Sequence, residues 1–251
     1  MTARSGDAGD WVRVFRPGGP SVPRLICLPD AGAAANAFFP LSTALAPGIE
    51  VHAVQYPGRQ DRVAEPCAED IGELADRVTG ALALWEGAPF AVYGHGMGAV
   101  VGFEVARRLE QVLTGSPVAL IVSGCPAPSR SGAAGLHLLP DQDLVAELYS
   151  LRDAGSPGAR DAELLKATFP AIRADFRALA AYRPEPAPPL RCPVTVLVGD
   201  SDPTVSLDEA RAWHEHTTGP FDLQVFPGGH GFPEARPGEF AEVVTAAVRR
   251  R

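Results

Sequence analysis

Six short apolar runs, each closed by turn residues, constrain most strongly what this chain of 251 residues can fold into. They span residues 24–28, 50–55, 90–93, 118–123, 194–198 and 223–226. Runs of this length that are rich in Val, Ile and Leu are typical of strands buried on both faces of a parallel sheet. A weaker candidate strand at residues 11–15 precedes them.

Segments with helical periodicity separate these runs. They span residues 68–84, 97–111, 207–216 and 239–248. Strands that alternate with helices predict right-handed βαβ units and a sheet with helices on both of its faces. We therefore expect an α/β fold with a mostly parallel central sheet.

Residues 129–190 interrupt this alternation, because they contain no convincing strand. A helix is expected at 141–151, and one or two more at 161–182, where Pro170 should limit continuity. The gap exceeds an ordinary crossover, which favours an inserted helical lid over plain core helices. The expected organisation is therefore a loose arm at 1–22, a core at 23–128 and 191–251, and a lid at 129–190.

Composition excludes several classes of partner. Lys plus Arg is 22 and Asp plus Glu is 30, so the net charge of −8 argues against a nucleic acid partner. No apolar run approaches the roughly 18 residues of a membrane span, and the first 20 residues lack a signal-peptide pattern, so a cytoplasmic protein is expected. The four cysteines lie far apart and are expected to be free buried thiols, not metal ligands.

The segment from Val92 to Val100 carries the strongest chemical signal. A strand, a turn with glycines two residues before and two residues after its centre, and a helix form a nucleophile elbow. The central residue of such an elbow has an exposed side chain at a sharp turn. Here the central residue is Gly96, which tolerates the backbone geometry but has no nucleophile. A dinucleotide-binding loop is disfavoured, since Gly94, Gly96 and Gly98 lack the G-x-G-x-x-G spacing.

An acid and a base follow in the chain order of a hydrolase triad. Asp202 follows the run at 194–198 and can orient an imidazole, with Asp200 as the competing choice and helix capping as the alternative role. His230 follows the last run in a glycine-rich loop, which suits a general base. The backbone N–H groups of Met97 and Ala31 are the expected oxyanion-hole donors.

Together these motifs are similar to those of type II thioesterases of polyketide and non-ribosomal peptide assembly lines, which are α/β-hydrolases. The resemblance runs from about Arg24 to the C-terminus, and its markers are LPDAG (28–32), QYPGR (55–59), GHGMG (94–98), SG (123–124) with AP (127–128), RADF (173–176), GDSDP (199–203) and PGGH (227–230). It implies a monomer without metal or cofactor that hydrolyses acyl chains held on the phosphopantetheine arm of an acyl or peptidyl carrier protein. The resemblance also implies that Asp202 and His230 are the acid and the base.

Three residues depart from the family pattern. Gly96 stands at the serine position, Asp30 replaces the histidine of a His-Ala-Gly-Gly loop, and Cys125 stands where a basic residue is common. Gly96 is either an engineered inactivation or a natural change. A natural change leaves four alternatives. The chain is a thioesterase whose nucleophile position is empty, or a cyclase, lyase or isomerase that uses His230 and Asp202 as a general base. Otherwise it is a hydrolase that activates water directly, or a non-catalytic protein that binds carriers or acyl chains. On the vacated-nucleophile hypothesis, Gly96→Ser should create hydrolysis.

Cys125 as a relocated nucleophile is disfavoured against a buried structural thiol. The expected pocket residues are Asp30, Cys125, Leu144, Leu148, Phe169 and Phe176, although helical spacing equally explains the lid residues among them as core.

Overall fold

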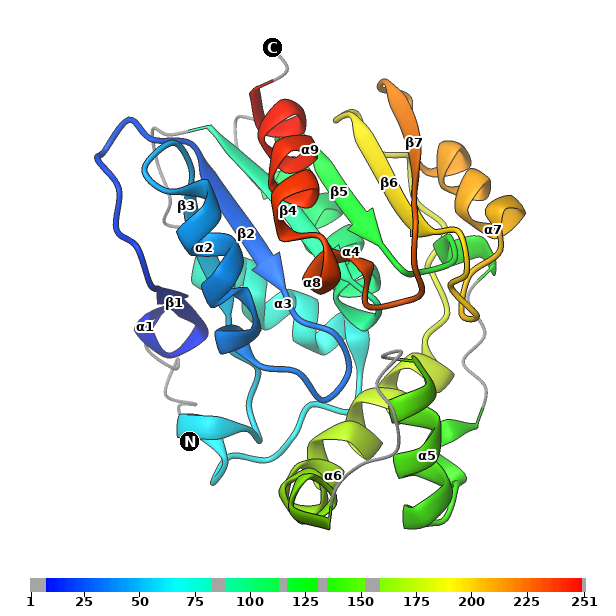
Figure 1. The fold of residues 1–251 in the computed structure, drawn as a ribbon. Coiled ribbons are helices and arrows are strands. Elements are labelled where there is room, and N and C mark those ends of the chain that lie inside the picture. The colour runs from blue at the N-terminus through cyan, green and yellow to red at the C-terminus, as the bar shows by residue number, and fades with distance from the viewer. Residues whose placement is uncertain (1–7, 83–88, 113–116, 131–134, 152–158, 250–251) are drawn as a thin grey trace.

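The computed structural model describes residues 8–82, 89–112, 117–130, 135–151 and 159–249. In these residues seven strands form one sheet in the order β1-β3-β2-β4-β5-β6-β7 (Figure 1). The strands are β1 (Val12–Val14), β2 (Arg24–Leu28), β3 (Glu50–Val54), β4 (Phe90–His95), β5 (Leu120–Ser123), β6 (Val194–Gly199) and β7 (Phe221–Phe226). Only β1 pairs antiparallel among them, so the predicted mostly parallel sheet is confirmed.

Helices cover both faces of the sheet. They are α1 (Ala8–Trp11), α2 (Phe39–Leu45), α3 (Ile71–Leu82), α4 (Met97–Val112), α5 (Asp141–Leu151), α6 (Ala159–Ala181), α7 (Leu207–Arg211), α8 (Phe232–Ala235) and α9 (Pro237–Arg249). Short 3₁₀ helices cover Ala35–Phe38, Gln60–Arg62, Pro128–Arg130, Leu136–Leu138 and Ala212–His216. The segment predicted as one helix at 207–216 is thus α7 followed by a 3₁₀ helix.

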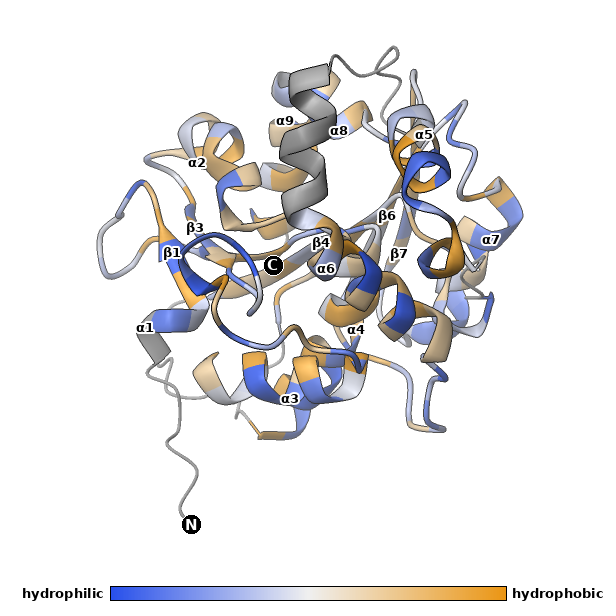
Figure 2. Cartoon of the chain, turned by 90° about the horizontal axis from the view of Figure 1, so that it is seen from below, coloured by the Kyte–Doolittle hydropathy of each residue, from blue (hydrophilic) through white to orange (hydrophobic). Residues whose placement is uncertain are grey.

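The alternation of side chains along β2 shows how the sheet is buried. Leu25 and Cys27 belong to one hydrophobic cluster with α2 and α9, whereas Ile26 and Leu28 belong to another with α3 and α4. Figures 1 and 2 show these helix pairs on opposite sides of the sheet. Residues 25–28 of β2 are all apolar because both faces of the sheet are covered.

The N-terminal segment is less loose than predicted. β1 pairs with β3 at the edge of the sheet, and Trp11 at the end of α1 is buried beneath the Arg62 guanidinium. Residues 1–7 of the predicted arm lie outside the described residues. Within residues 8–249, no helix of the described part is long and apolar enough to cross a membrane.

The chain between β5 and β6 carries α5 and α6, which lie beyond the carboxyl ends of the strands (Figure 1). α6 passes through Pro170 as one helix, so the expectation that this proline limits continuity was wrong. A proline inside a helix costs about 3 kcal/mol. Burial of the neighbouring Phe169 and Ile172 side chains, about 1.5–3 kcal/mol each, offsets that cost.

A buried ion pair fastens α6 to the core. The Arg59 guanidinium donates to both carboxylate oxygens of Asp175 at 2.8 Å, and only 5% and 2% of these side chains are exposed. Asp175 also accepts the backbone N–H of Gly32 at 2.7 Å. The helix is thereby joined directly to the loop that follows β2.

Candidate active site

The parallel strands bring five loops together at one edge of the sheet. A cavity of about 680 Å³ opens there between the strand ends and helices α5 and α6. Its walls include Asp30 after β2, Gly96 after β4, Cys125 after β5, Thr204 after β6 and His230 after β7. Residues from all five loops are thus brought to one place, as expected for the carboxyl edge of an open α/β sheet.

The turn between β4 and α4 has the geometry of the predicted elbow. Gly96 has a φ of +51°, which L-amino acids rarely adopt. A Cβ on Gly94 would lie 2.0 Å from the carbonyl oxygen of Gly98, and one on Gly98 would lie 2.0 Å from that of Leu28. The flanking glycines are therefore needed for strand and helix to pack this closely.

His230 and Asp202 form the predicted pair. Nδ1 of His230 lies 3.0 Å from Oδ2 of Asp202, whose side chain is fully buried. The Thr204 hydroxyl and backbone N–H both donate to the other Asp202 oxygen, at 2.6 and 2.8 Å. Asp200 instead accepts the backbone N–H of Gly228, so Asp202 is the aspartate that orients the imidazole.

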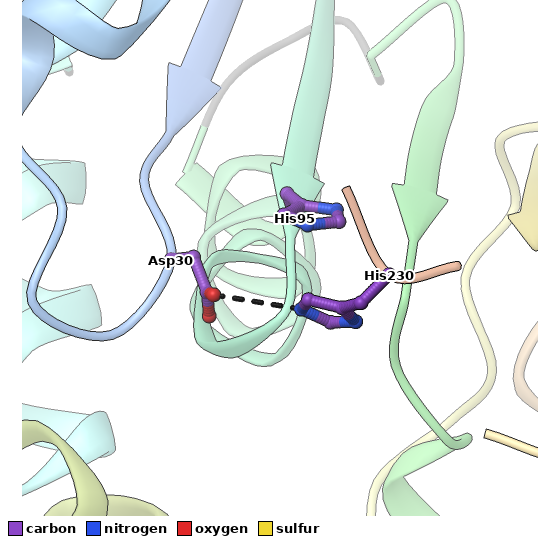
Figure 3. Close-up of side chains that lie close together, drawn as sticks. All are labelled: Asp30, His95 and His230. Carbon is purple, nitrogen blue, oxygen red and sulfur yellow. Dashed lines mark ion pairs between the residues drawn. The ribbon is translucent and has the colours of Figure 1, made fainter. Parts of the chain in front are cut away.

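The Asp30 carboxylate lies in the centre of the elbow. Its Oδ1 accepts the backbone N–H of Met97 at 2.9 Å, and its Oδ2 lies 3.6 Å from Nε2 of His230 (Figure 3). A Cβ built on Gly96 would lie 2.0 Å from Oδ1 of Asp30. The Met97 donor that was predicted for a substrate oxyanion is therefore already engaged, whereas Ala31, the other predicted donor, lines the cavity beside it.

Two carboxylates thus flank one imidazole, and they change its charge. Burial disfavours the protonated form of His230, but the hydrogen bonds and charges of Asp202 and Asp30 outweigh burial and raise its pKa to about 10. Burial opposes ionisation of Asp30, but the hydrogen bond and charge of His230 lower the Asp30 pKa to about 2. These shifts favour a carboxylate–imidazolium pair at neutral pH. The general-base role of His230 stays a prediction.

His95 is a site residue that sequence reasoning missed, although it directly precedes Gly96. Its ring lies against that of His230, with centroids 4.5 Å apart and planes tilted by 40° (Figure 3). Its Nδ1 is 2.8 Å from the Ser123 hydroxyl. Burial, together with the nearby charge of His230, lowers the His95 pKa to about 4, so this ring is neutral.

Asp30, His95 and His230 have ligand atoms within 4.8 Å of one another, a spacing at which a metal ion could be held. Imidazole lone pairs lie in the ring plane, however, and two rings that face one another do not converge on one ion. Asp30 is also bound to the Met97 N–H. The set therefore fits an ion pair beside a neutral histidine better than a metal centre.

Comparison with known proteins shows the family of this chain. The sequence pattern of the family "Thioesterase domain" matches residues 23–248. The chain belongs to the thioesterase family. Its fold is that of an α/β-hydrolase-type thioesterase, and thioesterases of this family need no cofactor.

Several similar proteins are thioesterases, some of them named for a biosynthetic pathway. The "Probable cadicidin biosynthesis thioesterase" of Streptomyces griseus is 43% identical over 92% of this chain, which spans 64% of that relative's length. "Thioesterase PikA5" of Streptomyces venezuelae is 44% identical over 89% of this chain and 80% of its own length. Of the solved structures, the type II thioesterase BorB from the borrelidin cluster has a TM-score of 0.90 at 47% identity, covering 96% of this chain and 98% of BorB. RedJ from Streptomyces coelicolor has a TM-score of 0.85 at 31% identity, covering 92% and 89%.

Helices α5 and α6 of this thioesterase-family chain place only some of the predicted pocket residues on the cavity wall. Leu148 and Phe176 line the cavity. Leu144 and Phe169 are buried in the hydrophobic core and are not among the lining residues. Helical periodicity identified all four as apolar face positions, but it does not distinguish a pocket wall from a core.

Cys125 also lines the cavity. Burial, followed by the charges of Asp30 and Asp202, raises the pKa of its thiol well above the usual value. A thiol that stays protonated is a poor nucleophile. The interpretation of Cys125 as a structural thiol stays a prediction.

Proposed function

We propose that this chain is a type II thioesterase-like protein that acts on acyl thioesters carried by an acyl or peptidyl carrier protein in secondary-metabolite biosynthesis. The observation that carries the proposal is the elbow, with the His230–Asp202 pair, at the floor of a 680 Å³ cavity under a helical lid. Membership of the thioesterase family and the biosynthetic relatives support the substrate class. The phosphopantetheine arm belongs to the substrate, and the protein is a cytoplasmic monomer.

On this proposal Gly96 stands at the position of the family's nucleophilic serine. A natural origin of the change is favoured over an engineered one. Asp30 occupies the space that a side chain at 96 would need, and a single Ser-to-Gly substitution in an ordinary thioesterase would not bring a carboxylate there. Asp30 and Gly96 are a matched pair.

A second candidate is a carrier or acyl-chain binder without turnover. It is favoured by one observation, that Asp30 engages the Met97 N–H on which a substrate carbonyl would otherwise depend. A cyclase, lyase or isomerase that relies on His230 as a resting base is disfavoured, since the two carboxylates keep the imidazole protonated.

The deciding experiment uses a panel of acyl-pantetheine and acyl-carrier thioesters. Products are identified by mass spectrometry, and carrier binding is measured by calorimetry, for the parent and for His230→Ala. Free acid from the parent and none from His230→Ala supports a thioesterase-like enzyme. Equal binding by both proteins without any product supports the binder, and absence of binding and product refutes the carrier-thioester assignment.

A further inference from the structure

We propose that Asp30 is the nucleophile of this site, and that its Oδ2 attacks the thioester carbonyl in place of the missing elbow hydroxyl. The inference deepens the proposed function and rests on it. It assigns a catalytic role to a residue that the family pattern does not supply at this position.

The position of the carboxylate carries the first part of the argument. Oδ1 of Asp30 lies 2.0 Å from where the Cβ of residue 96 would be, so the carboxylate fills the space of an elbow side chain. The Asp30 side chain is still 31% exposed and lines the cavity, where a substrate reaches it. A carboxylate at this point is accessible and close to the base of the predicted triad, as a covalent nucleophile must be.

The two oxygens of Asp30 have different surroundings. Oδ1 is held by the Met97 N–H at the first turn of α4, and Oδ2 faces Nε2 of His230 at 3.6 Å. Oδ1 would have to give up its hydrogen bond to the Met97 N–H in order to attack a substrate. The other oxygen therefore makes the attack.

The first step transfers the acyl group to Asp30. Oδ2 forms a bond to the acyl carbon, the carbon–sulfur bond breaks, and the imidazolium of His230 gives its Nε2 proton to the leaving thiolate. The products are a mixed anhydride on Asp30, a free pantetheine thiol and a neutral His230. Charge balances, because one carboxylate and one imidazolium are consumed together.

The second step follows from the loss of the Asp30 charge. Asp30 is one of the two carboxylates that favour the protonated form of His230, so acylation makes the imidazole more easily deprotonated and leaves it able to act as a base. His230 takes a proton from water, which attacks Cγ of Asp30, and the acyl carboxylate leaves. The developing oxyanion is Oδ1, which already accepts the Met97 N–H. His230 regains one proton and solvent receives the other, so the sum is thioester and water to carboxylate, thiol and one proton.

The test is a single turnover in ¹⁸O-labelled water with excess enzyme over an acyl-pantetheine thioester. The mechanism predicts one ¹⁸O atom in the peptide that contains Asp30 and an unlabelled acid, read by mass spectrometry. Label in the acid and none in Asp30 would overturn it, as would carrier binding without product. That last outcome leaves the carrier-thioester assignment intact, whereas loss of binding removes the proposed function itself.

Variants supply an independent measurement. Asp30→Asn retains an oxygen for the Met97 N–H but has no carboxylate, and we expect kcat to fall about 10³-fold or more. Asp200→Asn is the matched control, because Asp200 does not contact His230 and its amide oxygen can still accept the Gly228 N–H. Both variants are checked for folding by thermal denaturation. Turnover within about threefold of the parent in a folded Asp30→Asn protein refutes the nucleophile role.

Discussion

Introducing a serine at position 96 should destabilise the protein and fail to create a hydrolase while Asp30 is present. The new Cβ would lie 2.0 Å from Oδ1 of Asp30, so the carboxylate must leave its place. It then loses the charge-assisted bond from the Met97 N–H, which is worth about 1.5–3 kcal/mol. A non-glycine residue at φ +51° costs roughly 1–2 kcal/mol more. The expected loss is thus about 2.5–5 kcal/mol, or a fall in Tm of about 5–20 °C.

A double-mutant cycle isolates the interaction between the two positions. Asp30→Ala alone already removes the Met97 bond, so Gly96→Ser adds only backbone strain in the double variant. The free energies of unfolding, measured in urea for the parent, both single variants and the double variant, should show a coupling of about 1.5–3 kcal/mol. Additivity within about 0.5 kcal/mol would refute the reasoning.

The same four proteins also test the expectation that Gly96→Ser by itself creates hydrolysis. The hydroxyl that Gly96→Ser introduces can approach His230 only when the Asp30 carboxylate is absent. Acid release that depends on the new serine is therefore expected from the double variant and not from Gly96→Ser alone. The opposite order of activities would contradict the crowding that the structure shows.

Three further outcomes follow. The pKa of His230 is about 10 in the folded protein against an ordinary 6.5, so its contribution to stability is complete below pH 6.5 and is lost as pH rises to 10. The free energy of unfolding, measured in urea across this range, should therefore decline in the parent and not in His230→Gln. Arg59→Ala leaves Asp175 buried without its partner and should cost about 3–5 kcal/mol in urea denaturation, whereas removal of the exposed Arg77 should cost under about 0.5 kcal/mol. Cys125 should resist iodoacetamide at about pH 7.5 in the folded protein and react only after denaturation, as followed by peptide mass spectrometry, because burial keeps its thiol protonated.

The sequence predicted best those features that depend on residues close together in the chain or on the order of the strands. Apolar runs between turn residues located the strands of the sheet to within a few residues, since a buried parallel strand needs a continuous apolar segment. Chain order was enough to pair Asp202 with His230, because successive parallel strands end at the same edge. The catalytic roles of these two residues remain a prediction.

The other features of the fold and the site depend on contacts between residues that are far apart in the sequence. Nothing near Asp30 in the sequence indicates that its carboxylate reaches the space beside Gly96, or that it changes the protonation of His230. The continuity of α6 through Pro170 likewise depends on burial of the side chains around it. His95 carried a local signal, its place beside the elbow, but its neutrality follows only from its surroundings.

The clamp formed by Arg59, Asp175 and the Gly32 N–H joins α6 to the loop after β2. If the proposed function holds, it couples recognition of the acyl chain to the chemistry at Asp30. The loop that it holds also carries Asp30, and a Cβ on Gly32 would lie 2.4 Å from the α6 residue Ile172, so helix and loop are in direct contact. An acyl chain that lifts α6 must either break the clamp or draw Asp30 away from His230. Discrimination between chains of different length is therefore expected to appear in kcat as well as in KM.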